Sequence, residues 1–159
     1  MTVYSVAPVQ FGVGISGTTT TLGVNDPELG TTIRVGKLDY VFVYNAGGAS
    51  VPVGHAVICS AVTGYSVTVS ALTGVDLAIG VRQHSTMGTA TYGWVATRGI
   101  GTVKMTVSES AASGQLLCVG VDGGFGLKSN STDFKTPGVA KALEAFASAA
   151  SGQAFFAMF

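Results

Sequence analysis

Residues 40–44 read Tyr-Val-Phe-Val-Tyr, and this stretch places the chain in the all-β class. Aromatic and β-branched side chains are typical of strands, and here they occupy both faces of the segment. Two further stretches alternate apolar and polar residues, namely residues 66–71 and the segment Thr102–Ser108. In the second of these we expect Val103, Met105 and Val107 to point inward.

Short turns rich in glycine separate these strands. They are Ala-Gly-Gly at 46–48, Thr-Gly at 63–64, Met-Gly at 87–88 and Asp-Gly-Gly at 122–124. Glycine supplies the backbone conformations that tight turns need, so each pair or triplet predicts a reversal of the chain. Short strands with frequent turns predict a compact barrel-like or sandwich body, and 159 residues allow one such domain.

The second half of the body resembles the first when the chain is shifted by sixty residues. The stretch GHAVICSAVTGYSV, which begins at Gly54, then lies over GQLLCVGVDGGFGL, which begins at Gly114. This match predicts two pseudo-repeats of about 60 residues, covering about 50–100 and 110–159. Two such units, neither able to close its own core, should pair into one body.

The repeat decides how the segment VAKALEAFASAA at 139–150 should fold. Alanine, leucine, glutamate and lysine favour a helix, so composition alone would predict one. The repeat instead aligns this segment with a strand and a hairpin of the first unit. We therefore predict a strand over Val139–Phe146 and a hairpin over AFASAASGQAFF at 145–156, with a helix as the alternative for this segment.

Residues 1–35 differ in character from the rest of the chain, which forms the predicted body at 36–159. They are rich in glycine and threonine and show no helical periodicity, which predicts an extended N-terminal arm. The arm carries apolar side chains that should not stay in water, and they are expected to contact a neighbouring subunit or a larger surface. The leading members of this set are Tyr4, Val6, Val9 and Phe11. The alternative is an ordinary edge strand.

Charge is scarce and balanced. Charged residues make up 10% of the chain, against roughly 25% in ordinary soluble domains, and eight basic residues cancel eight acidic ones. Interfaces are depleted in lysine and glutamate, so this composition favours a subunit of an assembly. No run of basic residues predicts direct contact with nucleic acid. The uncharged stretch Tyr40–Val75 is interrupted by glycine and proline, which argues against a membrane span.

No pattern in the chain predicts catalysis, a metal site or a cofactor, so we expect the protein not to be an enzyme. The spacing Gly12, Gly14, Gly17 matches a phosphate-binding motif, but poor helix formers follow it. The histidines, His55 and His84, do not stand at zinc-ligand spacings from the cysteines or carboxylates. The start of the chain does not resemble a signal peptide, so we expect a reducing cytoplasm. The two cysteines, Cys59 and Cys118, should then be free thiols.

A group of aromatic residues near the ends of the two repeats could form a stacking platform for bases or sugars. Their equivalent positions in the repeats favour packing in the core or at a subunit interface instead. These residues are Tyr92, Trp94, Phe155, Phe156 and Phe159.

Over residues 28–159 the chain resembles the capsid decoration, or cement, proteins of tailed bacteriophages. Three stretches carry the likeness: Leu29-Gly30 followed by Tyr40–Tyr44 and a glycine-led strand, Gly80-Val81 with Tyr92–Val95, and the closing stretch TPGVAKALEAFASAASGQAFFAMF. These are patterns of glycines and strand residues.

The resemblance implies a β-tulip-like fold and a structural role in the virion. Such a protein, made in the host cytoplasm, would bind the major capsid protein on the outer capsid surface, as a homotrimer. There it would stabilise the shell, without touching nucleic acid or membrane. Two alternatives stay open: the base of a head or tail fibre, and a small β-barrel that binds a ligand in its interior. For the ligand-binding barrel, His55 or His84 would lie inside an apolar cavity.

Overall fold

The computed structural model describes residues 12–59, 64–69, 77–106, 108–120, 122–127 and 140–158. As predicted, the protein is all-β, and no helix occurs among the residues described. The strands are β1 (Thr18–Thr19), β2 (Thr32–Val35), β3 (Leu38–Asn45), β4 (Ala56–Cys59), β5 (Ser66–Thr68), β6 (Leu77–Val81), β7 (Thr91–Lys104), β8 (Leu116–Val119), β9 (Phe125–Leu127), β10 (Ala140–Ala142) and β11 (Ser151–Ala157).

Five of these strands close into a barrel. Their order is β3-β5-β4-β6-β7, and β7 pairs with β3 again to complete the circle. Only the pairing of β3 with β5 is parallel within this barrel. Closure removes the free edges that an open sheet would expose, so the predicted barrel-like body is confirmed.

The first barrel is filled by small β-branched side chains. Each of its five strands contributes to one buried cluster, which has the composition expected for the inside of a narrow barrel. Its members are Val41, Val43, Val51, Val57, Val67, Val69, Ile79, Met87 and Val95. Residues 40–44 therefore bury both faces, because Val41 and Val43 point into the barrel while Tyr40 and Phe42 belong to a second cluster.

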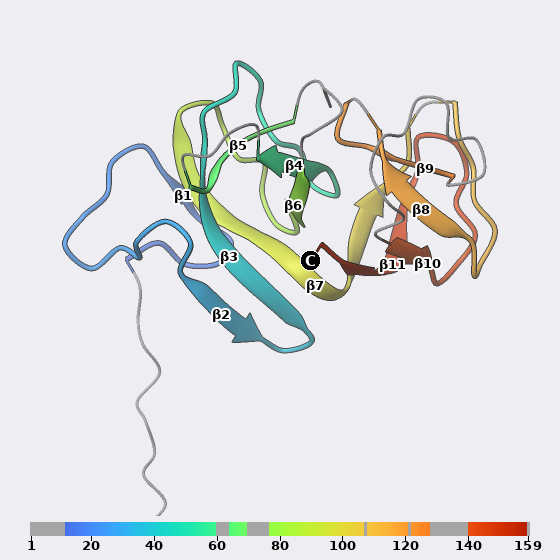
Figure 1. Ribbon diagram of the computed structural model, residues 1–159, viewed down its shortest axis with the longest axis horizontal. Coiled ribbons are helices and arrows are strands. Elements are labelled where there is room, and N and C mark those ends of the chain that lie inside the picture. The colour runs from blue at the N-terminus through green and yellow to red at the C-terminus, as the bar shows by residue number, and fades with distance from the viewer. Residues whose placement is uncertain are drawn as a thin grey trace, which may run out of the picture.

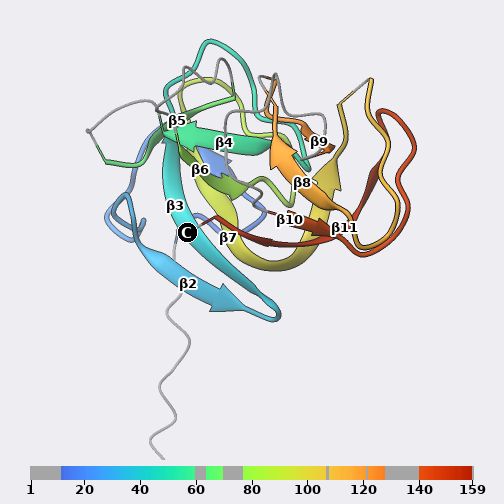
Figure 2. The same cartoon turned by 45° about the vertical axis from the view of Figure 1, so that its right-hand side comes forward.

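The strand β7 is 14 residues long and belongs to two rings of strands (Figure 1). Its first part pairs with β3, and its last part pairs with β11 in an unbroken register from Arg98 to Lys104. Beyond β11 the order continues with β10, β8 and β9, and a parallel bridge between Met105 and Phe125 leads back to β7. Figure 2 shows this second ring beside the first, with β7 curving from one to the other.

The larger hydrophobic cluster spans both rings. It contains Leu117, Phe125 and Phe156 of the second ring together with Phe42 and Trp94 on the other face of the first barrel's strands. Both units therefore share one continuous core as well as one strand.

The local predictions can be compared with these elements. The strand at 40–44 lies within β3, and β5 covers the first residues of the predicted strand at 66–71. Val103 and Met105 are buried as predicted, whereas Val107 lies outside the described residues. Neither cysteine forms a disulfide; Cys118 is buried and Cys59 is half-buried.

The segment of helical composition contains no helix in its described residues 140–150, and the predicted strand Val139–Phe146 is present over Ala140–Ala142. β10 pairs with β8 and β11, and Phe146 forms a bridge with Ala111. A tight turn around Ala149, whose φ of 55° is left-handed, then leads into β11. β10 and β11 form an antiparallel hairpin, whose first strand lies at Ala140–Ala142 and therefore before the predicted range 145–156. Tertiary pairing overrides helix propensity here because the strand buries Ala140 and Ala142 in the shared core.

Several features recur between the two rings at the predicted spacing. Gly54 and Gly114 both have left-handed φ, of 82° and 87°, just before β4 and β8. A bridge joins Val51 to Met87 in the first ring, and another joins Ala111 to Phe146 in the second. The repeat itself stays a prediction, because residues 60–63, 70–76 and 128–139 lie outside the described part of the chain.

Residues 12–35 of the predicted arm lie against the body. β1 pairs with β7 through Thr18 and Thr19, and β2 forms a hairpin with β3. The phosphate-motif glycines lead into β1 instead of a helix. The division of the chain into an arm at 1–35 and a body at 36–159 stays a prediction. Residues 1–11 of the arm are not among those described.

Candidate functional surface

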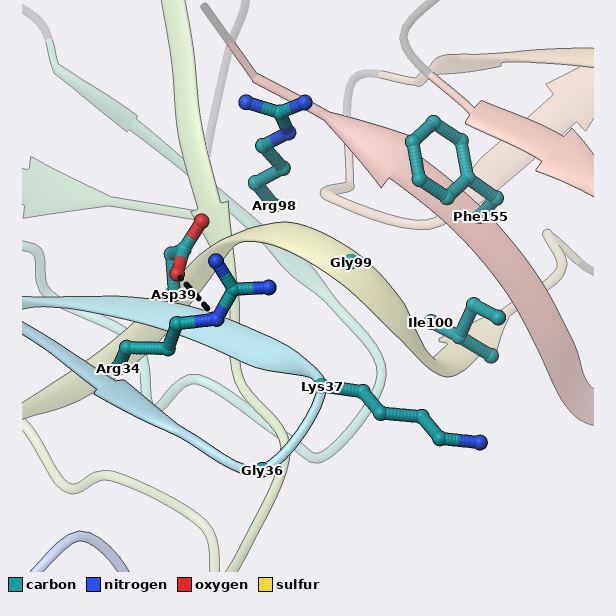
Figure 3. A pocket seen from close by; sticks show the side chains of 8 residues that line it. All are labelled: Arg34, Gly36, Lys37, Asp39, Arg98, Gly99, Ile100 and Phe155. Atoms are coloured by element: carbon teal, nitrogen blue, oxygen red, sulfur yellow. Dashed lines mark ion pairs between the residues drawn. The ribbon is translucent and has the colours of Figure 1, made fainter.

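A shallow groove lies where β7 bends from the first ring to the second. It encloses about 360 Å³ between the β2–β3 turn, the bend of β7 and β11 (Figure 3). The lining residues are Arg34, Gly36, Lys37, Asp39, Arg98, Gly99, Ile100 and Phe155. A second hollow of similar volume shares Arg34 and Asp39 with it.

A bulge and a glycine create the bend. The register between β3 and β7 shifts between Asp39 and Tyr40, which leaves Thr97 as the extra residue of β7. The Thr97 hydroxyl donates to the carbonyl oxygen of Asp39 at 3.2 Å. Two residues later, Gly99 has φ of 125°, and a side chain there would overlap the carbonyl oxygen of Lys37. Glycine is therefore required where the β2–β3 turn crosses β7.

The groove is basic. Three of the eight basic residues of the chain line it, namely Arg34, Lys37 and Arg98, and Asp39 is its one acidic residue. Three positive charges less one negative charge give a local net charge of +2 on a chain that is neutral overall. The Arg34 Nε atom lies 3.6 Å from Asp39 Oδ1, but both side chains are exposed, so this ion pair contributes little to stability.

Apolar side chains adjoin these charges on the outer face of the second ring. Ile100 on β7 pairs directly with Phe155 on β11, and their side chains are 41% and 43% exposed. The row continues across the sheet, because Phe155 faces Lys141 on β10 and Lys141 faces Leu116 on β8. Leu116 is 55% exposed. Lys141 thus separates Leu116 from the apolar pair Ile100 and Phe155. Exposed apolar residues gathered on one face of a sheet, with charged residues among them, indicate an interaction surface.

The charges of the groove gave no local signal in the sequence. Arg34, Lys37 and Arg98 stand singly, and they meet only because of the bend in β7. Phe155 was expected in the core or at a subunit interface, and the structure places it on the surface in this groove.

The other predicted aromatic residues lie elsewhere. Trp94 and Phe156 are fully buried in the core. Tyr92 is half-buried beside Tyr44, with the ring centroids 4.7 Å apart. Phe159 lies outside the described residues, as do the arm residues Tyr4, Val6, Val9 and Phe11.

A buried arginine holds residues 13–17 against the first barrel. Arg82 donates from Nη1 to the carbonyl oxygen of Trp94 at 2.6 Å and from Nε to that of Ser85 at 2.7 Å. Its Nη2 atom lies 3.4 Å from the carbonyl oxygens of both Ser16 and Gly17.

Two further side chains hold the same segment. The hydroxyl of Ser85 donates to the carbonyl of Ser16 at 2.7 Å, and Trp94 Nε1 donates to that of Val13 at 3.0 Å. The chain that continues to residues 1–11 is therefore fixed to the body at Val13.

Burial shifts the pKa values around this arginine. It lowers the pKa of Arg82 to about 10, and it raises the pKa of Tyr40 above its usual value. His84 Nε2 lies 3.2 Å from the Tyr40 hydroxyl. Burial and then the charge of Arg82 lower the pKa of His84. No carboxylate forms a described contact with Arg82, which is held by backbone carbonyl oxygens and a serine hydroxyl, as expected for a structural group.

Within the described ranges, no group of three histidine, cysteine or acidic side chains lies close enough to hold a metal ion. Nor do these ranges contain a helix that could cross a membrane. Both histidines are half-buried, and His84 lies against Tyr40, which belongs to the cluster outside the first barrel.

The fold and the groove define a class: an all-β protein of two strand rings joined by a shared strand, with a basic and apolar surface at the joint. No protein-family model matches the chain, and no curated protein matches it.

Proposed function

We propose that this chain is a structural virion protein that binds the outer surface of an assembled phage capsid and stabilises it. It acts without catalysis or a cofactor, its partners are the major capsid protein and copies of itself in a homotrimer, and it is found on the virion. The proposal starts from the three stretches that resemble decoration proteins. Its main structural support is the exposed row of Ile100, Phe155 and Leu116 beside three basic side chains.

That surface suits a protein that works by binding large partners. Its apolar side chains would leave water on assembly, and low overall charge keeps the desolvation cost of the surrounding surface small. The anchoring of Val13 by Trp94 adds a second attachment, because residues 1–11 then extend from a fixed point on the body. Several modest contacts on a symmetric lattice act together, because each one after the first is effectively intramolecular.

The direct test is co-sedimentation of the purified chain with empty, expanded heads of the phage that encodes it. We expect saturable binding, and decorated heads should withstand higher temperature before collapsing. A chain that stays in the supernatant at all concentrations would contradict the proposal.

Two truncations separate the arm from the body. Removing residues 1–11 leaves the described contacts of Val13, Ser16 and Gly17 in place, so we expect unchanged thermal stability and reduced occupancy of the shell. Removing residues 1–21 also takes away the carbonyl groups bound by Arg82 and Trp94, so this variant should be less stable as well. Full occupancy by the shorter truncation would refute the arm's role.

A further inference from the structure

The basic groove has a complementary surface elsewhere on the same chain. Residues 22–29 form a loop with three exposed apolar side chains: Leu22 at 39%, Val24 at 103% and Leu29 at 36%. The loop also carries Asp26 and Glu28 and no basic residue, which gives it a net charge of −2. Loop and groove thus each combine exposed apolar side chains with charges, and the charges have opposite sign.

The loop is held in one conformation. The Asp26 carboxylate accepts a hydrogen bond from the backbone of Gly23 at 2.6 Å, and the carbonyl of Asn25 accepts one from Gly12 at 3.0 Å. Pro27 is buried between the two acidic residues. An ordered loop loses little conformational entropy on binding, which favours association.

Val24 is the most exposed of the three apolar side chains of the loop. Val24 stands in water, although the turn that presents it is fixed on both sides. Glu28 is exposed and forms no described ion pair, so its charge is available to a partner.

Both views of the fold place this loop on the opposite side of the molecule from β11, which carries Phe155 (Figures 1 and 2). One copy therefore does not fill its own groove with its own loop. Residues 1–11 are a poorer match, because they contain no charged side chain to meet Arg34, Lys37 and Arg98.

We propose that copies of this chain associate head to tail, with the 22–29 loop of one copy docked in the groove of the next. Leu22, Val24 or Leu29 covers Ile100 and Phe155, while the loop carboxylates face the three basic side chains. A contact between two different surfaces forms a closed ring when its rotation closes, and three copies about a three-fold axis form one such ring. This inference rests on the self-association in the proposed function, but not on shell binding.

The test is a charge swap followed by sedimentation velocity of the full chain over a concentration series at low salt. Arg98→Glu and Glu28→Lys should each weaken association about tenfold or more, because each places like charges across the contact. The double variant should recover to within about threefold of the original affinity, because the pair is restored with reversed sign. Lys104→Glu makes the same change of charge on β7 outside the groove, so it should associate normally.

A mixing experiment tests the head-to-tail geometry. In an equimolar mixture of Arg98→Glu and Glu28→Lys, every loop–groove contact between unlike variants joins opposite charges, whereas every contact between like variants joins like charges. The mixture should therefore form assemblies that contain the two variants in equal numbers, while each variant alone stays monomeric at the same concentration. The fluorescence of Trp94 confirms folding of each variant.

The outcomes separate the contact from the broader proposal. An oligomer that neither single variant weakens would overturn the contact and leave self-association standing. Weakening without recovery in the double variant would overturn the pairing of these two charges. An original chain that is monomeric at every concentration would overturn both the contact and the homotrimer, but not binding to heads.

Discussion

Arg82 is the residue on which the attachment of the N-terminal segment depends most. It is fully buried, and its guanidinium group connects carbonyl oxygens of Ser85 and Trp94 with those of Ser16 and Gly17. Backbone carbonyls that are buried without a donor cost free energy, so one side chain satisfies groups from two distant parts of the chain.

Replacing Arg82 by methionine should lower the free energy of unfolding by about 2–4 kcal/mol, because several buried carbonyl oxygens lose their donor. Denaturant unfolding followed by tryptophan fluorescence measures this directly, because Trp94 is the chain's single tryptophan and lies next to the site. Arg98→Met is the matched control at an exposed position and should change stability little. Equal effects of the two substitutions would contradict the structural role of Arg82.

His84 gives the protein a dependence on pH with a definite sign. Its pKa is lowered in the folded state by burial and by Arg82, so the unfolded chain binds more protons around the usual imidazole pKa of about 6.5. Stability from this group is therefore complete above about pH 6.5 and is lost as pH falls toward the lowered value.

The expected result is a lower thermal midpoint at about pH 5 than at about pH 7.5, with a smaller difference in His84→Asn. His55→Asn is the control, since His55 lies near the surface with its ring by the carbonyl of Val53. The interpretation would fail if His55→Asn reduced the pH dependence and His84→Asn did not.

At the scale of elements, β7 organises the fold. One strand serves as the wall of two rings because a bulge at Thr97 and a glycine at Gly99 redirect it between them. The same bend forms the floor of the groove, so the fold's joint and the candidate binding surface are one feature.

Gly99→Ala should destabilise the protein by about 2–4 kcal/mol, because the added methyl group would overlap the Lys37 carbonyl and φ there is left-handed. Thermal unfolding measures the loss. Gly48→Ala is the control, because Gly48 lies in a loop with open space around its Cα atom, and it should be tolerated. If both variants melt with the original protein, then the bend does not require glycine.

On the scale of the whole molecule, the shared strand and shared core predict that both rings unfold together. Two probes report on different parts of the fold: Trp94 lies where β7 pairs with β3 of the first barrel, and Cys118 is buried in β8 of the second ring. In a Cys59→Ser background, the loss of Trp94 fluorescence and the gain in thiol reactivity should share one denaturant midpoint. Two separated midpoints would show that the rings are independent units.

Sequence by itself determined the class of this protein and much of its local structure. The strand at 40–44 and the inward Val103 and Met105 follow from side-chain type and alternation. The repeat even identified a strand within 139–146 against its helical composition. These predictions succeed because strand propensity, period and turn chemistry act over a few neighbouring residues.

Only the tertiary structure decided which strands pair, and therefore which distant residues come together in the groove and around Arg82. Arg34 and Phe155 lie more than a hundred residues apart, and they share a groove because β7 pairs with β3 on one side and β11 on the other. Arg82 likewise meets Ser16 only in the folded chain. Register and closure depend on the free energy of the whole barrel, so no local pattern of residues specifies them.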